Sequence, residues 1–353
     1  MGKVCKHAGG DMCERCSWEL PRDALLLVAR GRTARTAVPV AVVVGTVLSL
    51  VNQGTVIVEG TADTGTWARV AVNYAVPFVV ASIGFLLARR VRTDAADWPA
   101  YLAGYHDERP GITEAVLTRS VAGKHATPYS WLVQPLRDTE GPILDLACGS
   151  APTRPLLAQA RWFGVDASAG ELALGASVGR GPLVRARADA LPMGEDTIAT
   201  VCSAMSLQVL TPLDAVLGEV QRVLRPGGVF VALVPSRLGI ARGLFRWWRV
   251  MRVLGIRTQP WPNPQAQDGL AAILRAHGFV IDSDDRRVFR RAVTDRSEGA
   301  LLVDSLYLPQ IRQGRILAAR RMLGNWARPG RWLPLPLRRV VAHLPDEVRT
   351  QQR

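Results

Sequence analysis

Cysteine is scarce in this chain of 353 residues, and its five cysteines are too scattered to form a disulfide framework. The sequence therefore predicts a protein of a reducing compartment. Acidic side chains are also few, because 30 aspartates and glutamates stand against 44 lysines and arginines, a formal net charge of +14. A chain so basic is expected to seek polyanions or an anionic membrane surface. It is also long for one domain, so two are expected.

Charge is absent from two runs near the N-terminus, residues 36–58 and 70–88. At 23 and 19 residues, both runs are long enough to cross a bilayer. A signal peptide fits poorly because the first run begins late and a second follows it. Arginines flank the pair of runs and acids lie between them, so the positive-inside rule predicts a multi-pass membrane hairpin, residues 36–91, with both termini cytoplasmic. Two buried helices of a soluble domain are the alternative.

Small residues recur every four positions in the first run, at Ala41, Gly45 and Ser49, and Ala71 with Ala75 offers a matching face in the second. Such faces let helices touch closely, within one hairpin or between the copies of a homo-oligomer. Four polar or helix-disturbing residues lie in or near the apolar zone: Asn52, Gln53, Asn73 and Pro77. They are costly there unless they pair across helices or line a path.

Residues 42–54 and 73–78 are similar to the small two-helix nitrate/nitrite transport protein family. The resemblance implies transport, which would need an oligomer because two helices cannot enclose a pore alone. Membrane anchoring without transport is the other interpretation of the hairpin.

The first 35 residues form a basic segment that contains four candidate metal ligands: Cys5, His7, Cys13 and Cys16. Three thiolates and one imidazole within this short reach could close a tetrahedral structural zinc site. The spacing of the first pair is unusual, so unliganded cysteines in a cytosolic tail are the alternative.

A short apolar strand, residues 142–146, leads directly into a turn of small residues, Ala147 to Ala151. So little side-chain bulk lets the backbone pass close to a ligand, although such turns also occur for packing reasons. Further strands are predicted at 161–166, 183–188, 197–204 and 229–234, with helices between them at short intervals. This alternation indicates an α/β fold, a Rossmann-like doubly wound sheet whose ligand site lies at the carboxyl ends of the strands.

Four motifs occur in the order and spacing of one known family: Leu144-Asp-Leu-Ala-Cys-Gly-Ser-Ala151, Gly164-Val-Asp166, Asp189-Ala-Leu-Pro192 and Arg222-Val-Leu-Arg-Pro-Gly-Gly228. Over residues 100–290 the chain resembles the class I S-adenosylmethionine-dependent methyltransferases, type 11-like. The resemblance implies that Asp145, Ala147, Cys148 and Gly149 hold the methionine end of the cofactor. It assigns the ribose hydroxyls to Asp166 and the adenine to Asp189 and Ala190. Ala167, Ser203 and Tyr129 complete the expected cofactor site, with a core aromatic as the alternative role for Tyr129.

Two positions depart from the family pattern. Ala151, followed by Pro152, replaces a usual glycine, so a positive φ is expected to be harder to adopt there. The strand at 197–204 has Ile198 and Ala199 where the family often carries an acid. A degenerate domain that binds no cofactor is the alternative that these departures leave open.

The segment 238–262 follows the fifth strand, where this fold often inserts substrate-binding structure. Arginines recur there at helical spacing among tryptophan, phenylalanine and leucine, and no acid lies between Arg237 and Gln267. Such a helix suits a membrane interface, since arginine meets lipid phosphates and tryptophan lies at headgroup depth. A cap over the active site and, less favoured, a nucleic-acid surface are the alternatives.

Beyond this segment, a helix is expected at 265–277 and two closing strands at 279–281 and 287–293. Residues 310–345 carry eight arginines and no acid, which predicts a solvated basic tail or one in contact with anionic headgroups. No motif marks a catalytic base. His125, His277, Tyr129 and Glu114 are candidates by residue type alone, so the catalytic residue stays unassigned.

Together these features predict a cell-membrane methyltransferase with domain 92–345 facing the cytoplasm. S-adenosyl-L-methionine is the expected cofactor, and a lipid or other small amphiphile the expected acceptor, with nucleic acid disfavoured. The alternative is a nitrate/nitrite transport-related membrane protein with a fused regulatory methyltransferase domain.

Overall fold

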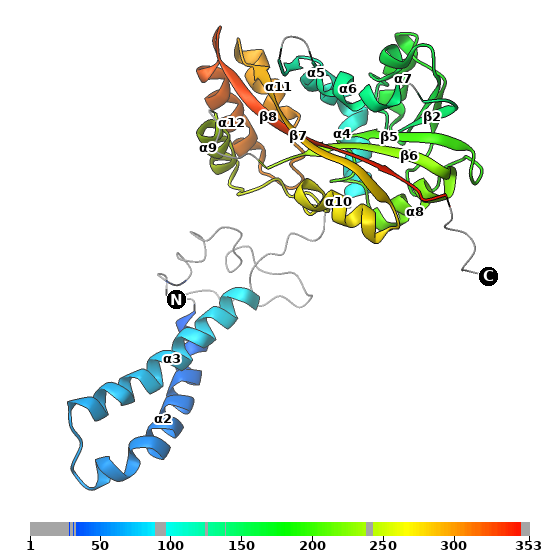
Figure 1. Cartoon of the computed structure of the whole chain (residues 1–353). Coiled ribbons are helices and arrows are strands. Elements are labelled where there is room, and N and C mark those ends of the chain that lie inside the picture. Colours follow the sequence, from blue (N-terminus) through cyan, green and yellow to red (C-terminus); the bar gives the residue numbers. More distant parts are fainter. Residues whose placement is uncertain are drawn as a thin grey trace, which may run out of the picture. The chain divides into compact units, whose positions relative to one another are not determined.

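The computed structural model describes residues 28, 31, 33–88, 97–123, 126–137, 139–237 and 243–346. The chain divides into two units, Met1–Ala95 and Ala96–Arg353, and each is described by itself. The first contains the helices α2, Ala34–Val58, and α3, Thr64–Ala88, which form a hairpin (Figure 1).

One side of α2 faces α3, and it is made of small and polar residues four positions apart: Ala37, Ala41, Gly45, Ser49 and Gln53. A Cβ on Gly45 would lie 2.5 Å from the Tyr74 ring, so only glycine admits this contact. Asn73 donates to Ser49 Oγ (3.2 Å) and to Gln53 Oε1 (2.9 Å). The small face predicted on α2 is confirmed, and its polar groups pair across the helices.

The face predicted on α3 is wrong. Ala71 and Ala75 are exposed, as is Asn52 of the predicted polar group. Tyr74 and Asn73 face α2 instead, because a ring over Gly45 and an amide between Ser49 and Gln53 fill the groove better than two methyl groups.

The outward side chains of the hairpin are mostly apolar, and several are more than half exposed: Val43, Val47, Leu50, Val51, Val72, Val79 and Val80. By length and composition, α2 and α3 (to Leu86) could each cross a membrane. Within the most apolar window of each helix, 17% of the residues of α2 and none of those of α3 are buried.

The second unit is built on an eight-stranded sheet of order β1-β7-β8-β6-β5-β2-β3-β4. Its strands are β1 Ser120–Val121, β2 Pro142–Leu146, β3 Arg161–Asp166, β4 Leu183–Arg185, β5 Ile198–Ala204, β6 Leu224–Pro235, β7 Val280–Ala292 and β8 Trp332–His343. The strands from β6 to β4 are parallel, and the other three pair antiparallel. The chain first builds outward from β2 to β4 and then returns to the other side of β2 with β5. A doubly wound sheet takes its ligand at this reversal.

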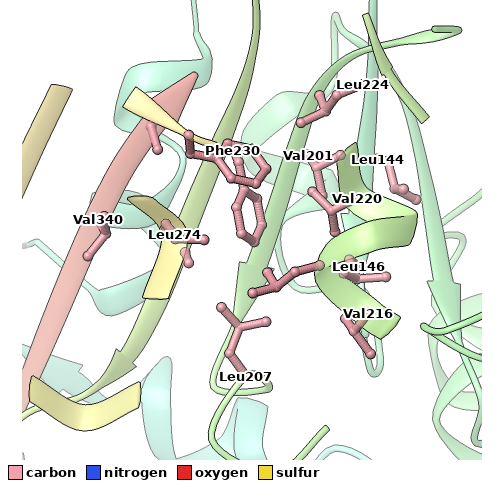
Figure 2. Packing of buried hydrophobic residues seen from close by; sticks show 14 of the residues in the cluster. Leu144, Leu146, Val201, Leu207, Val216, Val220, Leu224, Phe230, Leu274 and Val340 are labelled. Atoms are coloured by element: carbon pink, nitrogen blue, oxygen red, sulfur yellow. The ribbon is translucent and has the colours of Figure 1, made fainter. Parts of the chain in front are cut away.

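Helices cover both faces of the sheet (Figure 1). They are α4 Trp98–Glu108, α5 Ile112–Leu117, α6 Pro128–Leu132, α7 Ala169–Ser177, α8 Leu213–Val223, α9 Leu244–Leu254, α10 Ala266–Ala276, α11 Arg296–Asp304 and α12 Gln313–Trp326, with 3-10 turns η1 Gln134–Leu136 and η2 Arg154–Leu157. On one face, Phe230 packs with Val220 of α8 and Leu274 of α10 (Figure 2). Burial on both faces explains why β5 and residues 229–235 of β6 carry no charge.

The C-terminal region corrects two predictions. The two closing strands expected at 279–281 and 287–293 are one strand, β7, and the segment expected to be a basic tail contains α12 and the second closing strand, β8. Prolines at 334 and 336 argue against a strand, so β8 was not predicted from the sequence. They are tolerated because β8 has only β7 as partner there, and its pairing with β6 begins at Leu337.

Two of the eight arginines of the expected tail, Arg338 and Arg339, are buried in the domain, whereas Arg312, Arg321 and Arg328 are exposed. Arg338 is 5% exposed and donates its Nε to Asp284 (2.5 Å), which lowers the pKa of that carboxyl. Arg339 is 9% exposed, donates to the Trp131 carbonyl (2.8 Å) and lies 4.9 Å from the Trp131 ring. These side chains brace the sheet, so they are not available to lipid headgroups.

Candidate functional site

Every second residue of the turn after β2, from Ala147 to Ala151, has a positive φ. Ala147 has φ 54°, Gly149 55° and Ala151 59°. The expectation that Ala151 resists this conformation is wrong, because the turn bonds of the backbone hold it: Ala151 N–H donates to the Cys148 carbonyl (2.9 Å), and Arg154 N–H to the Ala151 carbonyl (3.2 Å). A left-handed alanine costs energy, and fixed strain of this kind is typical of a ligand clamp.

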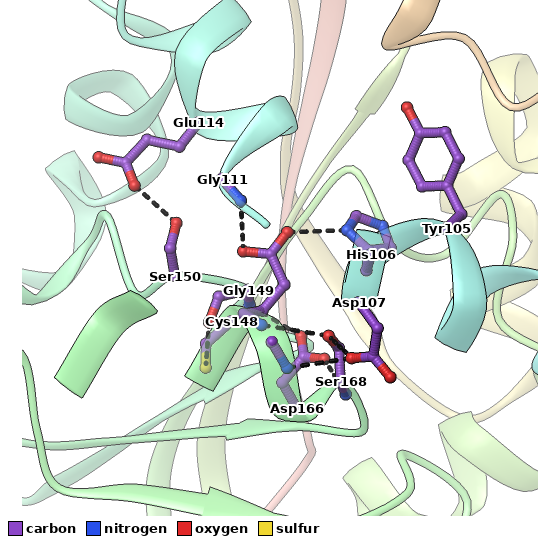
Figure 3. Close-up of polar contacts among 12 residues, drawn as sticks. Tyr105, His106, Asp107, Gly111, Glu114, Cys148, Gly149, Ser150, Asp166 and Ser168 are labelled. Atoms are coloured by element: carbon purple, nitrogen blue, oxygen red, sulfur yellow. Dashed lines mark hydrogen bonds and ion pairs between the residues drawn. The ribbon is translucent and has the colours of Figure 1, made fainter. Parts of the chain in front are cut away.

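Asp166 joins the end of β3 to this turn. Gly149 N–H donates to its Oδ2 and Ser168 N–H to its Oδ1, both at 2.8 Å (Figure 3). Burial raises the pKa of this carboxyl despite both hydrogen bonds. A carboxylate has about four acceptor positions, so two remain after these bonds. Asp166 lines the cavity and can accept from ligand hydroxyls there.

A cavity of about 600 Å³ lies at the carboxyl ends of β2, β3 and β5. Eight predicted cofactor residues line it: Tyr129, Asp145, Ala147, Cys148, Gly149, Asp166, Ala167 and Asp189. Tyr129 also packs in the core and is 4% exposed. The structure does not bring Ala190 and Ser203 to the cavity wall. Ser203 is instead buried in β5, where its hydroxyl donates to the Leu146 carbonyl (2.8 Å).

The cavity wall is acidic although the chain is strongly basic. Six acids line it, against one arginine and one histidine: Asp97, Glu114, Asp145, Asp166, Glu171 and Asp189. Three of them already contact a basic side chain: Asp189 contacts Arg187 (2.6 Å), Glu114 contacts Arg180 (2.8 Å) and Glu171 contacts His106 (2.8 Å). The hydrogen bond from Arg187 lowers the pKa of Asp189. The remaining acids suit a ligand that carries positive charge and hydroxyl groups, whereas they would repel a phosphate chain.

Asp145 is the most buried of these acids, at 1% exposed. Thr153 donates its hydroxyl to Asp145 Oδ2. Burial outweighs this bond and raises the pKa of Asp145 to about 7. The carboxyl therefore lies ready to ionise beside a cation.

This pKa predicts a pH-dependent stability that Asp145→Asn removes. Between pH 4 and pH 7 the folded chain keeps a proton that an unfolded aspartate has lost, so the free energy of unfolding falls as pH rises through this range. The raised pKa corresponds to about 4 kcal/mol at most. Urea unfolding of the wild type and of Asp145→Asn at pH 5 and pH 8 measures this effect. Relative to the wild type, the variant should have a higher free energy of unfolding at pH 8 than at pH 5. A difference that does not change with pH would refute the assignment.

Three further residues of the cavity wall were not predicted: His106 of α4, Glu171 of α7 and Tyr307, which follows α11. Glu171 is 2% exposed, bonded to His106 and to Gly111 N–H (Figure 3). In the sequence, Glu171 looks like an ordinary acid in the first turn of a helix. His106 and Tyr307 are 201 positions apart, and no pattern links them.

Of the four candidate bases predicted by residue type, Tyr129 and Glu114 line the cavity. His277 ends α10, where its Nδ1 lies 2.9 Å from the Ile273 carbonyl, and it does not line the cavity. Glu114 is held by Arg180 and Ser150, and these bonds lower its pKa although burial opposes them. His125 lies outside the described residues.

The proposed zinc ligands Cys5, His7, Cys13 and Cys16 also lie outside the described residues. Within the residues that the structure does describe, no group of three or more His, Cys, Asp or Glu side chains is arranged to hold a metal ion. The zinc site therefore stays a prediction.

Comparison with known proteins supports the class I methyltransferase resemblance. Residues 144–232 match the family model of a methyltransferase domain. The chain is 33% identical over 141 residues to a malonyl-[acyl-carrier protein] O-methyltransferase of Alcanivorax borkumensis, covering 36% of this chain and 48% of that protein. It is 34% identical over 92 residues to a ubiquinone/menaquinone biosynthesis C-methyltransferase of Acidiphilium cryptum, covering 26% and 37%. The chain thus spans about half the length, or less, of these relatives.

Two solved structures share a similar chain path. The [4+2]-cyclase SpnF has a TM-score of 0.47 at 17% identity, with 69% of this chain and 95% of that one covered. The YcgJ protein of Bacillus subtilis has a TM-score of 0.42 at 14% identity, with 62% and 98% covered.

Proposed function

With a methyltransferase domain as the premise, we propose that this chain is a membrane-tethered, S-adenosylmethionine-dependent methyltransferase whose acceptor is a lipid or other amphiphile. The observation that carries the cofactor assignment is the acidic cavity at the carboxyl ends of the strands. A sulfonium and an ammonium group bring positive charge, and a ribose brings hydroxyls, so this wall and this cofactor are complementary.

Each end of the cavity has a role in this proposal. The turn from Asp145 to Ala151 would hold the methionine end, Asp166 the ribose hydroxyls, and Asp189 the adenine. Of the two predicted adenine residues, only Asp189 lines the cavity. When bound, the cofactor supplies a methyl group that is already activated on sulfur, so the protein has to position the acceptor and accept its proton.

The hairpin supports the tether. Its outward surface is mostly apolar, and Asn73, Ser49 and Gln53 pair between the two helices, which suits a helix pair surrounded by lipid. The flanking arginines favour cytoplasmic termini. The pairing of Asn73 with Ser49 and Gln53 gives these groups a structural role, so nothing in the described hairpin favours transport.

The exposed side of α9 supports an amphiphilic acceptor. Phe245 and Trp248 are 65% and 50% exposed, and their rings stack with centroids 5.6 Å apart. Arg252 lies over the Trp248 ring at 5.2 Å, and Arg249 is 6.0 Å from the Phe245 ring. Val250 and Leu254 anchor the opposite side of the helix in the core. Aromatic rings with arginines over them suit the headgroup layer of an anionic membrane.

We expect the double substitution Phe245→Ser and Trp248→Ser to slow methylation of membrane-embedded acceptors about tenfold, because the loss of about 1.4 kcal/mol of interfacial binding has that effect. S-adenosylhomocysteine binding should not change, since neither residue lines the cavity. Leu156→Ser, at a residue 40% exposed on η2, is the matched control and should behave as wild type. Equal methylation rates in all three proteins would show that α9 does not contribute to reaching acceptors in the membrane.

The function is tested with tritium-labelled S-adenosylmethionine, the purified full chain and a fractionated membrane extract. Label in the lipid fraction is the expected result. Label in protein or RNA would show that the acceptor is a macromolecule and not a lipid. No label in any fraction would contradict the enzyme assignment.

A further inference from the structure

A hydrogen-bonded chain of three side chains crosses the cavity wall. His106 Nδ1 lies 2.8 Å from Glu171 Oε1, and His106 Nε2 lies 3.0 Å from the Tyr307 hydroxyl. All three residues line the cavity, yet Glu171 and Tyr307 are only 2% and 8% exposed. The three side chains come from α4, α7 and the segment after α11, so only the folded domain assembles them.

The direction of these bonds follows from the chemistry of the groups. Gly111 N–H donates to the second oxygen of Glu171 (2.9 Å), as it would to a carboxylate. A carboxylate only accepts, so His106 carries a proton on Nδ1. In the neutral ring Nε2 is then an acceptor, and Tyr307 donates its hydroxyl proton to it. Burial raises the pKa of Tyr307, which keeps this proton on the phenol until another proton replaces it.

Tyr307 lies near two parts of the cavity wall, the residues that follow β5 and the residues at the end of β3. Tyr307 packs with Val209, which follows β5, while Glu171 and His106 lie beside Asp166 at the end of β3. The end of β3, where the cofactor is expected, and the residues that follow β5 therefore both lie near the Tyr307 hydroxyl. Nearby Tyr105 belongs to the same aromatic cluster, but its hydroxyl donates to the Asp304 carbonyl (2.6 Å) and it does not line the cavity.

We infer that Tyr307, His106 and Glu171 form a proton relay that accepts the proton of the methyl acceptor. This inference rests on the proposed function. As the acceptor atom forms its bond to the methyl carbon, the carbon–sulfur bond of the donor breaks and its electron pair stays on sulfur. The proton of the acceptor atom passes to Tyr307 Oη, and the proton of Tyr307 passes to His106 Nε2. Glu171 balances the charge of the resulting imidazolium.

The relay is tested by separating rate from cofactor affinity in the full chain. With the membrane extract and labelled donor, Tyr307→Phe and His106→Gln should each slow methyl transfer about 100-fold, the usual contribution of a general base. The dissociation constant of S-adenosylhomocysteine should change less than about threefold. Tyr105→Phe, the matched control, should keep the wild-type rate. If the rate and the affinity fall together, the three residues only position the cofactor, and the relay is wrong.

A second readout needs no acceptor. Nitrogen-15 spectra of the histidine rings, with His106 assigned from the His106→Gln variant, should show a neutral ring protonated on Nδ1. A proton on Nε2 would overturn the relay. If the wild type labels no extract while this tautomer is observed, the proposed function fails and the hydrogen-bond assignment does not.

Discussion

Asp166→Ala is expected to weaken equilibrium binding of S-adenosylhomocysteine about 100-fold. The carboxylate uses two acceptor positions on Gly149 N–H and Ser168 N–H and keeps two for the ribose. Hydrogen bonds to a charged group contribute about 1.5–3 kcal/mol each, so the loss of two exceeds a hundredfold in affinity unless the site relaxes. Isothermal titration of the purified full chain measures the effect.

Two further variants make this result interpretable. Asp166→Asn keeps the shape of the side chain and should lose about tenfold, since a neutral amide oxygen is a weaker acceptor. Asp282→Ala removes a half-exposed acid of β7 that pairs with His343 and does not line the cavity, so this variant should bind as wild type. An Asp166→Ala protein that is folded and still binds within threefold of wild type would remove the ribose assignment.

Deletion of residues 1–95 is expected to leave cofactor binding intact while slowing methylation of the membrane extract at least tenfold. The second unit contains the sheet, the cavity and its own hydrophobic cores, so its affinity for S-adenosylhomocysteine should stay within about threefold. The tether replaces a bimolecular encounter by one at high effective concentration, and the deletion forfeits that gain.

The control for the deletion is a water-soluble presentation of the same acceptors in detergent micelles. There the full chain and the truncated chain should methylate at similar rates, because the tether confers no advantage. Equal rates on the intact extract would show that the hairpin does not deliver the enzyme to its acceptor.

Much of the parallel half of the sheet could be predicted from the sequence. Its signals are local: each strand is a short apolar run, and the turn after β2 and the acid ending β3 are contiguous motifs. Eight of ten predicted cofactor residues line the cavity for the same reason. Ser203 fails because adjacent residues of a strand point to opposite faces, and its neighbour Ala204 lines the cavity instead. Ala190 lies in the turn after β4, where the neighbour of a cavity residue need not line the cavity itself.

The rest depends on distant pairing that leaves little local trace. The arginine pair of β8 resembles a solvated tail until Asp284 and Asp285 of β7 are placed beside it. Glu171, His106 and Tyr307 acquire a role only when three separate segments meet. On α3, the sequence showed two small residues, but the contact was made by the ring of Tyr74, which needed Gly45 opposite it.

The most direct measurement is isothermal titration of S-adenosylhomocysteine into the purified wild-type chain. We expect saturable binding at one site per chain, the cavity at the carboxyl ends of the strands. Absence of binding, or binding that a nicotinamide dinucleotide abolishes at equal concentration, would contradict the assignment of the acidic cavity to this cofactor.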